Sequence, residues 1–208
     1  MGVIKTALEL ALERTENVKS DKSVIGQFEM KQKGKKIANS FLDENIDILA
    51  EIKKSASEQE QKDSLKQGIF DILITQIALP SGEDEKKRIE KVGQGLSAIL
   101  ENSKEKNEFA AMYKQLLQII SQYLQEAAHY EKAIRQQYAP KLRQKEEEIS
   151  RRMGREVRID PMQDPEFVAF YNQAFASLKS KYEPVVEQAK EEARRMFEGL
   201  NSSGSAGN

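Results

Sequence analysis

The sequence predicts an all-α protein, a helical bundle of about five helices with a long antiparallel helical hairpin. Three observations favour this fold. Apolar residues recur at three- and four-residue steps through most of the 208 residues, the period of one face of an α-helix. Charged residues make up 32% of the chain, a proportion typical of long helices. The chain has only 11 glycines and 5 prolines, so long segments run without a helix breaker.

The N-terminal quarter contains two apolar stripes of helical period. One runs from Ile4 to Val18, and the next runs from Ile25 to Ile52 with a gap at KQKGKK, residues 31–36. Glycine inside a helix costs roughly 1 kcal/mol relative to alanine. Gly34 therefore predicts a bend or break at 33–35, and the polar residues 43–45 predict another.

The next segment predicts a deeply buried helix. Ser57 and Glu60 have the spacing of a capping box, which marks a helix start. The following stretch GIFDILITQIALP, residues 68–80, is apolar on nearly all sides and must be covered on most faces. Its isoleucines also favour a strand, but the helical period is kept, so we expect a helix. After Pro80, Ser81 is expected to cap a shorter helix that reaches Leu100.

A long heptad pattern follows and predicts a helix packed on two sides, as in coiled coils. Its members are Phe109, Tyr113, Leu116, Ile120, Tyr123, Ala127, Tyr130 and Ile134. The pattern fails at Gln137, and Pro140 then predicts a kink or break. We therefore expect a bundle at residues 1–136, a hairpin arm packing partly on it at 137–200, and a disordered Gly/Ser/Asn-rich tail at 201–208.

The arm is expected to fold as two antiparallel helices with residues 154–163 at its tip. Gly154 is suited to end the first helix, and Asp164 followed by Pro165 predicts the start of the second. The second helix has its own heptad-like seam. Its members are Phe167, Tyr171, Ala174, Leu178, Tyr182, Val185, Ala189, Met196 and Leu200.

Composition excludes several classes of function. The chain has no cysteine, which rules out disulfides, zinc–thiolate sites and thiol catalysis. Its 33 basic and 34 acidic residues nearly cancel, so no global charge attracts nucleic acid or membranes. No apolar run approaches the roughly 20 residues of a membrane span. We expect a cytoplasmic protein with no cofactor and no membrane span.

One pair of residues suggests a metal site. Glu126 and His129 match the Glu-x-x-His spacing that di-iron helical bundles use twice. His129 is the only histidine, so one chain cannot supply a second such pair. A metal-dependent helical-bundle enzyme around these residues is an alternative hypothesis, and the competing interpretation is a polar surface pair. We expect no catalytic or metal-binding residues.

A basic cluster surrounds the predicted tip. Between Lys132 and Arg158 there are nine basic and four acidic side chains, an excess of five positive charges. Such a surface suits phosphates or an acidic protein, but it lacks the interleaved aromatics that stack on bases. Glu–Arg pairs within a solvated helix face are the competing interpretation. The candidate partner contacts are Arg151, Arg152, Arg155, Val157, Arg158, Ile159 and Met162.

These patterns favour a non-enzymatic protein-interaction or assembly module that acts through helix faces and the hairpin tip. The partner is expected to be another protein or a second copy of the chain. Association with nucleic acid through the basic tip is the alternative. The apolar residues Val157, Ile159 and Met162 leave one question open. They either fold back to make a packed corner or project as a docking knob.

Three stretches, KTALELALERTE (5–16), GKKIANSFLD (34–43) and MGREVRIDP (153–161), carry a resemblance. The chain resembles a family of small bacterial all-helical proteins of unknown function. The resemblance implies a self-standing cytoplasmic protein, and it implies no activity, cofactor or catalytic residue.

Overall fold

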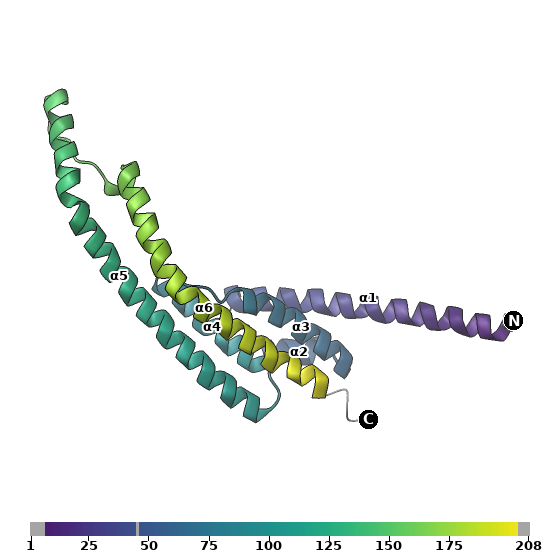
Figure 1. Ribbon diagram of the computed structural model, residues 1–208. Coiled ribbons are helices and arrows are strands. Elements are labelled where there is room, and N and C mark those ends of the chain that lie inside the picture. The colour runs from purple at the N-terminus through teal and green to yellow at the C-terminus, as the bar shows by residue number, and fades with distance from the viewer. Residues whose placement is uncertain (1–6, 45, 204–208) are drawn as a thin grey trace, which may run out of the picture. The chain divides into compact units, whose positions relative to one another are not determined.

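A computed structural model describes the backbone of residues 7–44 and 46–203 and the side chains of residues 24–44 and 46–199. Within these residues the chain is all-α, as predicted (Figure 1). The helices are α1 (Ala7–Glu44), α2 (Ile48–Ser55), α3 (Gln59–Thr75), α4 (Glu83–Ile99), α5 (Ser103–Met153) and α6 (Pro165–Ser203), with a short 3-10 helix η1 (Pro161–Gln163) before α6.

The chain divides into two compact units that interleave along the sequence. The first unit comprises Met1–Ile77, Arg88–Ala110 and Ala193–Asn208, and the second comprises Ala78–Lys87 and Ala111–Glu192. Helices α4, α5 and α6 therefore each contribute residues to both units. The predicted division into a bundle at 1–136 and an arm at 137–200 follows other boundaries and stays a prediction.

In the first unit, α1 crosses α3 where each helix has a glycine. A Cβ atom on Gly34 would overlap the carbonyl oxygen of Leu65, and one on Gly68 would overlap the carbonyl oxygen of Lys31. The two backbones therefore touch without intervening side chains. Of the bend or break predicted at 33–35, the break is wrong, because α1 is continuous from Ala7 to Glu44. Gly34 permits a close approach instead of ending a helix.

The core of this unit lies on the inner faces of α1, α3 and α4. Its fully buried side chains include Leu65, Ile69 and Leu73 of α3 and Val92 and Leu96 of α4. The stretch at 68–80 is helical as far as Thr75, and Ile77 beyond it is also buried. Helix α3 is therefore buried on most of its sides, as the apolar pattern predicted.

The helix starts differ from the predicted caps. Glu58, not Ser57, precedes α3, and its side chain makes no capping hydrogen bond. Helix α4 starts at Glu83, and the Ser81 backbone N–H donates to the Glu85 carboxylate at 2.6 Å. The acid of the first turn therefore caps the preceding backbone, and the serine hydroxyl does not cap the helix. The predicted break at 43–45 is confirmed, since α1 ends at Glu44 and Asp47 caps α2 through the backbone N–H of Leu49 and Ala50.

Helices α5 and α6 continue through their prolines. Pro140 lies inside α5, which runs unbroken to Met153, and Pro184 lies inside α6. The predicted interruption at Pro140 is therefore not a helix end. Helix α6 reaches Ser203, three residues into the predicted disordered tail, and residues 204–208 lie outside the described residues.

The second unit is an antiparallel helical hairpin of α5 and α6. Tyr123 packs with Leu178 and Tyr182, while Ile134 and Tyr138, later in α5, pack with Phe167 at the start of α6. The rings of Tyr123 and Tyr182 meet edge to face at 5.4 Å, and those of Tyr138 and Phe167 do so at 5.2 Å. Such contacts add about 0.5–1.5 kcal/mol each beyond the buried area.

The first predicted seam is buried over most of its length, whereas Tyr171 and Ala174 of the second seam are only half-buried. Tyr130 of the first seam is exposed. In the second seam, Ala189 is buried as predicted. Val186, Ala193 and Phe197 are buried in place of Val185 and Met196, which are only half-buried. Leu200 lies outside the residues whose side chains are described.

Candidate interaction site

The end of the hairpin is built by a sharp stop and a return along the same helix. Gly154 follows Met153 with a φ of 65°, the left-handed conformation that glycine adopts at little cost. The chain then runs back beside the last turns of α5. The Val157 N–H donates to the Ser150 hydroxyl, and the Ile159 N–H donates to the Glu146 carboxylate, both at 2.9 Å. The prediction that Gly154 ends the first helix is confirmed.

The start of α6 is fixed by two aspartates. Asp160 accepts a hydrogen bond from the Met162 N–H at 3.0 Å and so caps η1. Asp164 accepts from the Glu166 N–H at 3.1 Å, and Pro165 takes the first helical position. The predicted Asp-Pro helix start is therefore confirmed. The connection from 154 to 164 is held by side chains at four points, so it presents its outer residues on a fixed backbone.

Beneath this connection, Lys145 joins the two helices of the hairpin. Its Nζ lies 2.7 and 2.9 Å from the two Asp164 oxygens, and it also contacts the Glu166 carboxylate. Asp164 is only 5% exposed and accepts a further hydrogen bond from the Tyr138 hydroxyl at 3.0 Å. Lys141 binds Glu166 from the next turn at 3.1 Å. A buried carboxylate requires partners of this kind.

The charges of this cluster shift one another's proton affinities. The hydrogen bond from Lys145 holds the pKa of Asp164 below its ordinary value, and Lys145 and Lys141 lower the pKa of Glu166. The same bonds, first of all that to Asp164, raise the pKa of Lys145. Burial and the bond to Asp164 raise the pKa of Tyr138. The lysine and the two carboxylates of the cluster are therefore charged across the neutral range, and they link the two helices of the hairpin.

The predicted contact residues fall into two groups. Val157 and Ile159 are half-buried, and their backbone N–H groups are bonded to α5. Met162 is 47% exposed, and the arginines at 151, 152, 155 and 158 are all exposed. The stretch is thus a packed corner at Val157 and Ile159 and a projecting surface at its arginines and Met162.

Two of the arginines find no carboxylate partner among the described side chains. Arg151 pairs with Glu147 at 3.6 Å, and Arg158 pairs with Glu156 at 3.4 Å. Neither Arg152 nor Arg155 makes an ion pair with any side chain that the structure describes. Each Glu–Arg bond is long and exposed, and such pairs contribute little. Two of the four arginines therefore lie in local Glu–Arg pairs, and the other two make no ion pair with a described side chain.

Sequence reasoning missed one member of this surface. Met153, the last residue of α5, is 53% exposed beside Arg152 and Gly154. Met153 was not among the predicted contact residues. A glycine directly after it was the available sign, because a side chain at a helix end has fewer neighbours. We call Arg152, Met153, Arg155 and Met162 the tip surface.

The proposed metal pair gains no further ligand. The Glu126 carboxylate binds Lys181 of α6 at 2.9 and 3.1 Å, which also lowers the pKa of Glu126. His129 is exposed. No group of three or more histidine, aspartate and glutamate side chains within the described residues could hold a metal ion. Glu126 therefore serves as a link between the helices of the hairpin.

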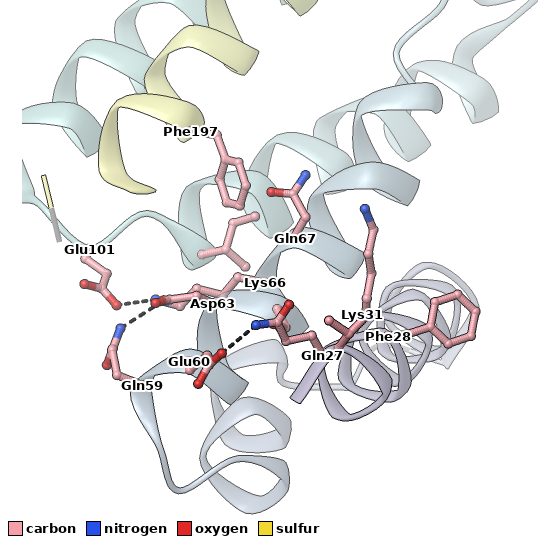
Figure 2. A pocket seen from close by; sticks show the side chains of 13 residues that line it. Gln27, Phe28, Lys31, Gln59, Glu60, Asp63, Lys66, Gln67, Glu101 and Phe197 are labelled. Carbon is pink, nitrogen blue, oxygen red and sulfur yellow. Dashed lines mark hydrogen bonds and ion pairs between the residues drawn. The ribbon is translucent and has the colours of Figure 1, made fainter. Parts of the chain in front are cut away.

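The first unit has an open groove that the sequence did not reveal. Its volume is about 730 Å³, and residues of α1, α3 and the end of α6 line it (Figure 2). Val24 and Phe28 of α1 contribute to it and are 61% and 62% exposed. Phe197 points into it from α6 and stacks on Phe70 at 4.2 Å. This groove depends on packing between distant segments, which periodicity does not specify.

Polar side chains form the rim of the groove. It has three carboxylates, from Glu60, Asp63 and Glu101, and two ammonium groups, from Lys31 and Lys66. Lys66 pairs with Glu101 and lowers the pKa of that carboxyl group. Lys31 pairs with Asp71 outside the groove at 2.8 Å. Asp63 and Glu60 accept hydrogen bonds from the neutral amides of Gln59 and Gln27. Among the described residues that line the groove, three carboxylates thus stand against two ammonium groups.

A protein-family model matches most of the chain. The model of a family of unknown function, DUF6657, matches residues 49–195. The chain belongs to DUF6657. The DUF6657 match includes the tip surface and the stretch MGREVRIDP, while the other two stretches of the resemblance precede it. No curated protein and no solved structure matches.

Proposed function

We propose that this DUF6657 protein is a non-enzymatic interaction module that binds an acidic protein segment at the tip surface. The observation that carries the proposal is the pairing of exposed cations with exposed apolar groups. Arg152 and Arg155 find no carboxylate among the described side chains, and Met153 and Met162 are about half exposed beside them. Arginine and methionine are both enriched where proteins bind proteins.

The fixed backbone supports this proposal. A surface held by hydrogen bonds loses little conformational entropy on binding, and Val157, Ile159, Met162 and Glu166 each have a bonded N–H. Methionine side chains adapt to partners of different shape. Together these features suit a partner whose acidic groups meet the arginines and whose apolar side chains cover the methionines.

Nucleic acid is the alternative partner, and the tip surface favours it less. Residues 150–163 contain no aromatic side chain on which a base could stack. None of the helices in the part of the chain that the structure describes is long and apolar enough to cross a membrane. We keep the cytoplasm as the proposed location, because the cysteine-free composition fits a reducing compartment.

The test is affinity capture from the native cell with three forms of the full chain. One is unchanged, one has Arg152→Gln and Arg155→Gln, and the matched control has Arg143→Gln and Lys179→Gln. The control removes the same charge from exposed positions on α5 and α6, outside the tip surface. We expect the unchanged chain and the control to capture the same protein. The amount of that protein captured by the tip variant should be at least tenfold lower.

Each sample is divided and one half is treated with nuclease. Recovery that survives nuclease and depends on the tip supports the proposal. Recovery that disappears with nuclease assigns the tip to nucleic acid, and recovery that the tip variant leaves unchanged overturns a role for the tip surface.

A further inference from the structure

The tip surface contains the two methionines that solvent reaches most easily among those whose side chains the structure describes. Met153 is 53% exposed and Met162 is 47% exposed, whereas Met30, Met112 and Met196 are partly buried. The chain has no cysteine and no tryptophan, so its only side-chain sulfur is the methionine thioether. A mild oxidant therefore has its most accessible sulfur targets on one small surface, because oxidation follows exposure.

The local backbone keeps both side chains in solvent. Met153 is the last residue of α5, and Gly154 with its φ of 65° turns the chain immediately after it. Met162 lies in η1, where its backbone N–H donates to the Asp160 carboxylate at 3.0 Å. An oxidant can thus reach the two thioether groups without any opening of the fold.

We propose that Met153 and Met162 are a site of reversible oxidation to methionine sulfoxide, and that the oxidised tip surface releases its protein partner. This inference rests on the proposed function and adds a means of regulating it. The oxidant is a peroxide, of which hydrogen peroxide is the simplest.

The reaction transfers one oxygen atom and two electrons. The thioether sulfur attacks one oxygen of hydrogen peroxide, so an S–O bond forms as the O–O bond breaks. The departing hydroxide takes the proton from the sulfur-bound oxygen and leaves as water. Sulfur is oxidised from thioether to sulfoxide, and the peroxide is reduced. Methionine sulfoxide reductases reverse the change.

Oxidation changes the character of the tip surface and spares the fold. A sulfoxide is polar, so an apolar group of a partner that covers it must displace bound water without a compensating hydrogen bond. The guanidinium groups of Arg152 and Arg155 keep their charge. Neither methionine is buried in the core, so the packing of the two units does not depend on them. We therefore expect loss of binding from a chain that is still folded.

The test treats three forms of the full chain with hydrogen peroxide, removes the peroxide with catalase, and then repeats the capture from cells. One form is unchanged, one has Met153→Leu and Met162→Leu, and the matched control has Met30→Leu and Met112→Leu. Leucine has a similar volume and carries no sulfur to oxidise. Mass spectrometry of peptides measures the sulfoxide at each methionine before and after capture, and circular dichroism verifies the fold.

We expect sulfoxide to form faster at Met153 and Met162 than at the partly buried methionines. Treatment should lower capture by the unchanged chain and by the control about tenfold, as when a central side chain of an interface is lost. The leucine form should capture as much after treatment as it does before treatment. Incubation of the oxidised, unchanged chain with methionine sulfoxide reductases should restore its capture.

The inference is overturned if the partly buried methionines oxidise as fast as the exposed pair, if oxidation of the pair leaves capture unchanged, or if the reductases restore nothing. An equal loss of capture in the leucine form would also overturn it. The untreated samples separate these failures from failure of the proposed function. If the untreated chain captures no protein through its tip surface, both fail, and if it does so regardless of peroxide, only the inference fails.

Discussion

At the scale of single residues, two glycines determine how closely α1 and α3 approach. Alanine is the better helix former by roughly 1 kcal/mol, so a glycine within each of two crossing helices needs a reason. At Gly34 and Gly68 the reason is the carbonyl oxygen of the opposite helix, which occupies the place of a Cβ atom. The two glycines lower the helix propensity of α1 and α3, and in return they let the two backbones pack directly against each other.

A substitution at Gly34 separates these two effects. We expect Gly34→Ala to lower the free energy of unfolding by about 1–3 kcal/mol, the usual cost of overpacking, because the overlapping atom belongs to a backbone that cannot rotate away. Gly26→Ala is the matched control on the same helix, since nothing lies within 4 Å of its new Cβ. The control should gain up to about 1 kcal/mol. Urea denaturation of both measures this, and a gain at Gly34 would contradict the close crossing.

Single residues also show where the sequence was sufficient and where it was not. Gly154 and the Asp164–Pro165 pair acted as predicted, because helix ends depend on local backbone conformation and on hydrogen bonds within a few residues. Gly34 was misread as a break, since its function depends on Leu65 across the fold. Local chemistry is readable from the chain, and a contact between distant segments is not.

At the scale of helices, the same distinction explains the second seam. After Tyr182 the heptad pattern predicted Val185, Ala189 and Met196, but the buried positions are Val186, Ala189, Ala193 and Phe197. From Tyr182 onward the buried face thus advances by steps of four, three, four and four residues. Pro184 lies at the point of change, inside the helix. A strict heptad repeat drifts relative to a straight helix. The sequence pattern alone therefore does not determine which residues face the core along the whole helix.

The hairpin of α5 and α6 has a closing cluster whose charge predicts a pH dependence. The pKa of Asp164 is lowered from 3.8 by Lys145, so its contribution to stability is present above pH 3.8 and is lost as the pH falls through the lowered value. The pKa of Lys145 is raised from 10.5, so its contribution persists below pH 10.5 and is lost only as the pH rises through the raised value.

The variant Asp164→Asn isolates the acid limb of this dependence. Asparagine keeps the acceptor for the Glu166 N–H and so keeps the cap, but it loses the charge opposite Lys145. We expect the variant to be less stable than the unchanged chain at pH 7, with a difference that shrinks as the pH falls below about 3.8. Thermal unfolding across the range pH 2 to 7 measures this difference. A stability difference that stays constant with pH would show that the charge of Asp164 does not interact with Lys145.

At the scale of the whole molecule, the two units are built from the chain in different ways. The second unit consists mainly of one continuous stretch, Ala111–Glu192, whose helices pair along a hairpin. The first unit is assembled from three separated stretches, of which the last begins at Ala193. Contacts between residues far apart in sequence require costly loop closure. We therefore expect the stability of the first unit, unlike that of the hairpin, to depend on the C-terminal stretch of the chain.

Phe197 is the side chain on which this dependence can be measured. It is 3% exposed and its ring stacks on Phe70 of α3 at 4.2 Å with an interplanar angle of 7°. We expect Phe197→Ala to lower the free energy of unfolding of the first unit by about 3–5 kcal/mol, as for other buried aromatics. Phe197→Leu, which keeps an apolar side chain and loses only the stacked ring, should cost less.

Amide hydrogen exchange assigns this loss to the correct unit. In Phe197→Ala, the amides of α3 should exchange faster, because they open with the first unit, whereas amides around Tyr123 and Leu178 should keep their protection. Equal acceleration in both units would show that they unfold as one. Unchanged exchange in α3 would show that the last stretch of the chain contributes nothing to the first unit, and that the stacked pair is incidental to its stability.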